Sequence, residues 1–124
     1  MAKSADNTVL DALLDQIKNN ADKMTLCNAQ PTTFTEADAT FMLANVAMAP
    51  TDFTIADGIT SGRRVTVGSK AGVTVATTGN ATHIALVDTT SSVLLFVTTI
   101  KARNVTAAAT VDFPQWDIEI SDPA

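Results

Sequence analysis

The chain has 124 residues, of which 46% are hydrophobic and 17% are charged. This length and composition suit one buried core, so we expect a single folded domain over residues 1–124 rather than a disordered chain. Eight basic and thirteen acidic residues give a net charge of −5, which argues against nucleic acid and anionic membrane surfaces as partners.

The strongest local pattern is an amphipathic helix over residues 5–22. Ser4 and Asp6 offer a helix start. Apolar residues then recur at helical spacing, namely Val9, Leu10, Leu13, Leu14, Ile17, Ala21 and Met24. An isolated helix of this length is marginal in water. Its apolar stripe must therefore pack on the chain's own body, which we favour, or on a neighbouring subunit.

Residues 24–48 read as a mixed connection between this helix and the rest of the chain. Residues 24–28 predict a short strand, and Gln30 and Pro31 mark a break in the chain after it. Thr35, followed by acidic residues, predicts the start of a short helical turn that runs to residue 43.

From residue 50 to residue 120 the apolar residues alternate with a period of two, which is typical of strands. We expect strands at 53–55, 65–67, 73–77, 81–87, 93–100, 105–111 and 116–120, and turns at 57–58, 68–72, 79–80 and 88–92. The sequence therefore predicts a mainly β fold. It is an antiparallel sandwich or jelly-roll-like body of about six to eight strands, with an N-terminal amphipathic helix.

Residue types that carry chemistry are sparse. His83 is the only histidine and shares a strand face with small apolar residues, which favours a structural role over a catalytic base. Asp117 and Glu119 lie two apart and could pair as acid and base, but apolar residues alternate with them, which favours a solvated strand face. Cys27 is the only cysteine, which excludes an internal disulfide and favours a small buried hydrophobe over a reactive thiol. We expect no catalytic residue, no metal ion and no cofactor.

The N-terminal residues lack the charged region and apolar core of a signal peptide. No apolar run approaches the roughly 20 residues needed to cross a bilayer. We therefore expect a protein that is made in a cytoplasm and has no membrane partner.

Six short segments follow one another along the chain. They are Leu10-Asp11-Ala12-Leu13-Leu14, Met24-Thr25-Leu26-Cys27, Gln30-Pro31-Thr32, Gly62-Arg63-Arg64-Val65, Gly79-Asn80-Ala81-Thr82-His83-Ile84-Ala85-Leu86-Val87-Asp88 and Pro114-Gln115-Trp116-Asp117-Ile118-Glu119-Ile120. This order resembles that of small virion structural proteins of tailed bacteriophages, and the likeness spans most of the chain.

The resemblance implies a protein that makes and breaks no bond and acts by assembly. The expected location is the virion, assembled in the cytoplasm of a bacterial host, where the chain binds the major capsid protein as a decoration or cement protein. The resemblance also implies a homo-oligomer, with a trimer favoured.

Two apolar segments are the candidate contact surfaces. One is the helix stripe of Leu10, Leu14 and Ile17. The other lies within the apolar run of residues 93–97 and includes Val93, Leu95 and Val97, where every position is apolar as in a strand buried on both faces. For both segments the alternative is plain core.

Two other functions stay open. One keeps the virion but places the chain in a tail fibre, adhesin or baseplate that binds a host receptor through Thr-rich loops. The other is an enzyme, for example a carbohydrate-active sandwich. It is disfavoured because such sites need converging carboxylates and aromatic platforms, whereas this chain has one Trp and no Tyr.

Overall fold

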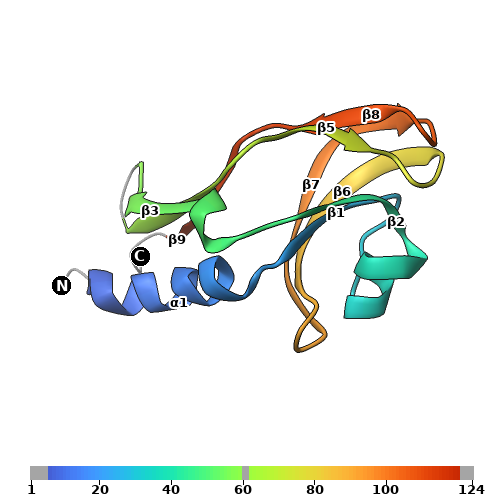
Figure 1. The fold of residues 1–124 in the computed structure, drawn as a ribbon. Coiled ribbons are helices and arrows are strands. Elements are labelled where there is room, and N and C mark those ends of the chain that lie inside the picture. The colour runs from blue at the N-terminus through green and yellow to red at the C-terminus, as the bar shows by residue number, and fades with distance from the viewer. Residues whose placement is uncertain (1–5, 60–61, 121–124) are drawn as a thin grey trace.

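The structure is a computed structural model that describes residues 6–59 and 62–120. Within these residues it contains one N-terminal α-helix and nine strands in antiparallel sheets (Figure 1). The predicted fold class, a mainly β sandwich-like body with a helix at the N-terminus, is confirmed.

The helical elements are α1 (Asn7–Asn20), the π-helical turn η1 (Glu36–Thr40) and the 3-10 turn η2 (Pro50–Asp52). The strands are β1 (Lys23–Cys27), β2 (Met42–Ala47), β3 (Phe53–Asp57), β4 (Arg63–Val67), β5 (Lys70–Thr74), β6 (Gly79–Asp88), β7 (Val93–Val105), β8 (Thr110–Phe113) and β9 (Trp116–Ile120).

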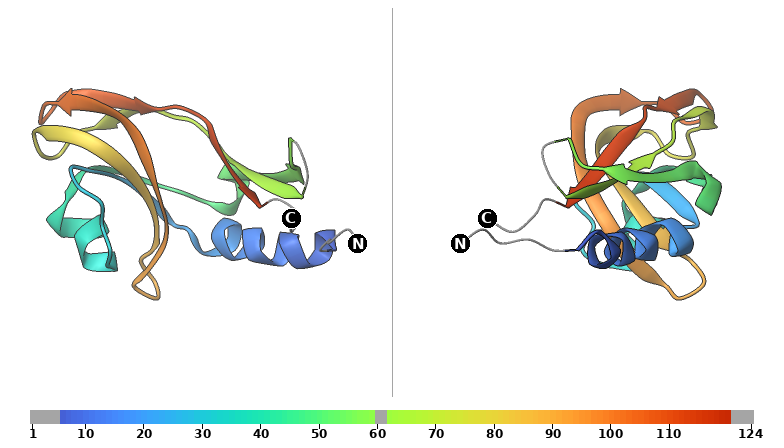
Figure 2. Two further views of the ribbon diagram at one scale, coloured as in Figure 1. Left: turned by 180° about the vertical axis from the view of Figure 1, so that it is seen from behind. Right: turned by 90° about the vertical axis from the view of Figure 1, so that its left-hand side faces the viewer.

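The strands form three antiparallel sheets. Their orders are β2-β1-β6-β7, β3-β4-β9 and β5-β8. The long strands β6 and β7 run side by side and curve together along the molecule (Figure 2). On the opposite edge of the first sheet, Ala44 of β2 bridges to Val75 just after β5.

Asp6 is the N-cap of α1, and its carboxylate accepts a hydrogen bond from the Thr8 backbone N–H at 2.8 Å. Leu10 and Leu14 are only 4% and 0% exposed and face the body. A short ion pair, Arg63 Nε to Asp11 Oδ1 at 2.7 Å, joins the helix to β4. The helix stripe therefore packs on the chain's own sheets, as favoured from the sequence.

The core has two parts on opposite faces of the β2-β1-β6-β7 sheet. The larger part joins α1 and the two smaller sheets to one face, which carries Met24 and Leu86. The smaller part lies on the other face, where Ala37 of η1 packs with Ala85 and Val87 of β6. Strands β1 and β6 are consequently buried on both faces for most of their length.

The expected helical turn over residues 35–43 is too long. The π-helical turn ends at Thr40, and Met42 and Leu43 already belong to β2. This strand was missed because its pattern, Met-Leu-Ala-Asn-Val-Ala, does not alternate, and the pairing with β1 decides its conformation. Ser4, named as part of the helix start, lies outside the described residues.

Several expected turns and strands have different bounds in the structure. Strand β5 begins at Lys70 inside the expected 68–72 turn, and β6 includes the expected turn at 79–80. The expected strand at 105–111 contains the turn between β7 and β8. There Ala108 has a φ of 71°, and its backbone N–H donates to Val75 O. A left-handed alanine is uncommon, so the sequence gives little sign of this turn.

The neighbouring residues Leu13 and Leu14 offer a matched test of the packing of α1. We expect Leu14→Ala to lower the free energy of unfolding by about 3 kcal/mol, because it leaves a cavity in a fully buried position. Leu13 is 56% exposed, so Leu13→Ala should cost about 0.5 kcal/mol or less. Urea denaturation of both variants measures the difference, and equal losses would show that this face of the helix is not buried.

Candidate interaction surfaces

The titratable groups singled out in the sequence do not converge. Over residues 6–59 and 62–120, no three His, Cys, Asp or Glu side chains come together as a metal site. His83 is half-buried, and its Nδ1 lies 2.8 Å from the hydroxyl of its neighbour Thr82. None of the helices in the described part of the chain has the length and apolarity needed to cross a membrane.

Asp117 and Glu119 lie on the exposed face of β9, while Ile118 between them is buried. Asp117 pairs with Arg64 at 3.3 Å, and Glu119 accepts a hydrogen bond from the Ile59 backbone N–H at 3.2 Å. The interpretation of this segment as a strand with a solvated face is confirmed. The two carboxylates make separate structural contacts.

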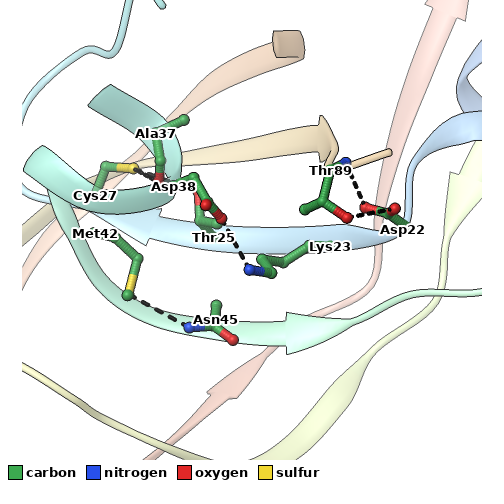
Figure 3. Close-up of polar contacts among 9 residues, drawn as sticks. All are labelled: Asp22, Lys23, Thr25, Cys27, Ala37, Asp38, Met42, Asn45 and Thr89. Carbon is green, nitrogen blue, oxygen red and sulfur yellow. Dashed lines mark hydrogen bonds and ion pairs between the residues drawn. The ribbon is translucent and has the colours of Figure 1, made fainter. Parts of the chain in front are cut away.

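Cys27 is fully buried between β1 and η1 (Figure 3). Its Sγ lies 3.5 Å from Thr25 Oγ1 and donates to Ala37 O at 3.7 Å. Burial raises the pKa of the thiol, so the neutral S–H form is favoured. The sequence interpretation of Cys27 as a small buried residue agrees with this position.

Two polar contacts join a hairpin turn and a helical turn to the start of β1 (Figure 3). Asp22 accepts hydrogen bonds from the Thr89 backbone N–H at 2.9 Å and hydroxyl at 2.7 Å. Lys23 Nζ lies 2.9 Å from Asp38 Oδ1 of η1. Partial burial raises the pKa of Asp22, but the hydrogen bonds from Thr89 outweigh it and hold this pKa below its ordinary value.

The first candidate contact surface, the helix stripe, lies inside the molecule. Leu10 and Leu14 are buried, and Ile17 is half-buried and packs against the larger core. The expectation of a contact role for Leu10 and Leu14 is thus corrected, since their side chains are covered by the chain itself. An apolar stripe predicts burial but does not indicate whether the chain's own body or a neighbouring subunit covers it. The sequence therefore left both alternatives open.

The second candidate surface lies on β7, at the edge of the four-stranded sheet. Val93 is 43% exposed, and Leu95 and Val97 are half-buried. A strand at an edge has one strand neighbour, here β6, so its apolar side chains are covered less than those of a central strand. These three residues are therefore accessible in part to a partner.

An apolar surface outside the two candidate segments lies on the outer side of α1. Val9 and Leu13 are 57% and 56% exposed and are four residues apart, so they lie on one face of the helix. We call this pair the α1 ridge. The helical spacing predicts both residues as part of the buried stripe. Only the direction in which the helix packs separates them from the buried Leu10 and Leu14.

A groove of about 450 Å³ lies between the end of β7 and β8. Apolar residues from four strands and one turn line its floor, among them Leu26, Ala81, Ile84, Val105, Val111 and Phe113. Lys101, Arg103 and Asp112 supply charged groups, and Ala102 is an exposed lining residue. We call it the β7–β8 groove. Its residues are distant in the sequence, so no local pattern could have identified it.

Comparison with known proteins leaves the chain without a match: no protein-family model, no curated protein and no solved structure is similar to it. The resemblance to phage virion proteins stays a prediction, and the function is inferred from the surfaces described above.

The contact between Asp22 and Thr89 predicts a contribution to acid stability. Because the folded-state pKa of Asp22 is lowered, the ionised form stabilises the fold above the unfolded pKa of about 4. That stability is lost as the pH falls through the folded pKa. Asp22→Asn should therefore lose less stability than the wild type between about pH 5 and pH 3.

Denaturant unfolding at several pH values measures this difference, and Thr89→Ala, which removes one of the donors, should give an intermediate slope. If Asp22→Asn and the wild type lose stability equally on acidification, the contact does not act as described.

Proposed function

We propose that this chain is a non-enzymatic structural protein of a phage virion, and that it acts as a capsid decoration or cement protein. In this role it is a homo-oligomer that binds the major capsid protein and stabilises the head lattice. The proposal is based on the resemblance of the sequence to small virion structural proteins of tailed bacteriophages. Its physical support comes from the surfaces that the fold leaves open.

The observation that carries the proposal is the presence of two apolar surfaces on different parts of the molecule. The α1 ridge consists of exposed side chains of α1, whereas residues of β8 line the β7–β8 groove. Helix α1 and strand β8 lie at opposite sides of the fold (Figure 1). A cement protein must contact two neighbouring capsid subunits at once. Two separate apolar surfaces on one chain allow each copy to contact two neighbouring subunits.

Neither surface needs to bind strongly by itself. A contact of about 1,000 Å² is near the lower limit for a specific interface. Repeated over a shell, such contacts resist pressure together, because several must open before one copy is released. The small size of both surfaces is compatible with this kind of assembly.

The test uses heads of a phage that encodes this chain, purified without it, to which the purified protein is added. Leu13→Glu places a charge on the α1 ridge, and Ala102→Glu places one in the β7–β8 groove. Both positions are exposed, so folding should be retained. Each variant should lower binding by at least about tenfold, equivalent to about 1.4 kcal/mol. Thr54→Glu, at an exposed position on β3, is the matched control and should bind normally.

Mass spectrometry of the wild-type virion measures the copy number. The proposal requires roughly one copy per capsid subunit or per lattice joint. A few to tens of copies per particle would contradict it and would favour the tail fibre, adhesin or baseplate alternative. Normal binding by both charged variants would show that these two surfaces do not contact the capsid.

A further inference from the structure

Strand β7 has an open edge. It is the longest strand among the described residues, with 13 residues, and it lies at the end of the β2-β1-β6-β7 sheet. In the described part of the chain its backbone hydrogen-bonds to β6 alone, and no loop or side chain bonds to its other edge. An edge of this length presents a row of unpaired N–H and C=O groups that can pair with another strand.

The opposite edge of the same sheet is covered within the chain. Val75 bridges to Ala44 of β2, and the backbone N–H groups of Ala76 and Thr77 donate to Leu43 O. The two edges of this sheet therefore differ in whether the chain itself covers their backbone groups. The shorter edge strand is protected by its own chain, whereas the longer one is not.

The first part of β7 lacks the charges and prolines that usually protect an edge. Residues 93–100 contain no charged residue and no proline, and Leu94, Leu95, Phe96 and Val97 are each half-buried. Two irregularities interrupt the pairing with β6, one at each side of a regular stretch at residues 96–99. That stretch is regular and uncharged, which makes it suited to pairing.

The charges of β7 are placed at one end only. Lys101 and Arg103 follow the uncharged part, whereas the other end meets the 88–92 turn, where Asp88 accepts hydrogen bonds from two backbone N–H groups and Asp22 holds Thr89. In an antiparallel pair of two β7 strands, the basic end of each copy lies toward the acidic end of the other. A parallel pair would instead bring four cations within about one Debye length, roughly 10 Å.

We propose that β7 is a self-association edge, and that two copies of this chain pair their β7 strands antiparallel around residues 96–99 to form one continuous sheet. Each copy contributes four strands, so the joint sheet has eight. The pair is related by a twofold axis and uses the same edge of both copies, so it closes and does not grow into a fibre. The half-buried apolar side chains of β7 gain cross-strand neighbours in the same step.

This inference does not depend on the virion assignment, because the purified full-length chain tests it without capsids. Sedimentation velocity over a concentration series should show a species of twice the mass of one chain. Thr99→Lys places a charge at an exposed position within the regular stretch and should raise the dimer dissociation constant by at least about tenfold. Thr54→Lys, the same change on the edge strand β3, is the control and should leave the dimer unchanged.

The direction of pairing is tested by a spin label on Asn104→Cys, an exposed position near the end of β7. The native Cys27 is fully buried, so labelling should be selective. An antiparallel pair places the two labels more than about 30 Å apart, whereas a parallel pair places their backbones about 5 Å apart.

Three results would overturn the inference: a monomer at every concentration, a dimer that Thr99→Lys does not weaken, or a short distance between the two labels. A trimer, which the resemblance in the sequence implies, would also overturn it, because a twofold pair of edges cannot close a ring of three.

Discussion

The fold depends on covering both faces of the β2-β1-β6-β7 sheet. Its central strands carry apolar or small side chains on both sides, so an exposed face would leave residues such as Leu86 or Val87 in water. Helix α1 and the two smaller sheets cover one face, and η1 covers part of the other. This arrangement fixes the direction of α1, and it thereby decides that Leu14 is core while Leu13 is surface. The elements that cover the β2-β1-β6-β7 sheet thus determine which apolar side chains stay exposed to solvent.

The sequence predicted those parts of the fold that a local pattern specifies. The 3.6-residue period gave α1, and strict alternation gave β9 with Ile118 inside. The apolar run at residues 93–97 gave a strand but not its place, because a continuous apolar run resembles a central strand and β7 is an edge. The local pattern does not indicate which strands will lie beside a given strand in the sheet. For the same reason β2 was missed and the left-handed turn at Ala108 was read as a strand.

The candidate surfaces divide in the same way. Val93, Leu95 and Val97 were selected for their apolar character and lie on an accessible edge, whereas Leu10 and Leu14, selected by the same criterion, are core. Hydrophobicity measures the tendency to be covered and does not distinguish cover by the chain from cover by a partner. The β7–β8 groove is formed by residues as far apart as Leu26 and Phe113, so only the folded structure can reveal it.

The two proposals use neighbouring parts of β7: the pairing stretch is residues 96–99, and the β7–β8 groove begins beside it at Ile100 and Lys101. The α1 ridge belongs to a different element. Pairing through β7 does not involve the α1 ridge, so a dimer carries two ridges and can make two contacts to a lattice. The second contact of a tethered pair forms at a high effective concentration once the first is made. A weak ridge contact that one copy could not sustain can therefore hold a dimer on a shell. Self-association would then be the step that converts a small, weakly binding fold into a cement.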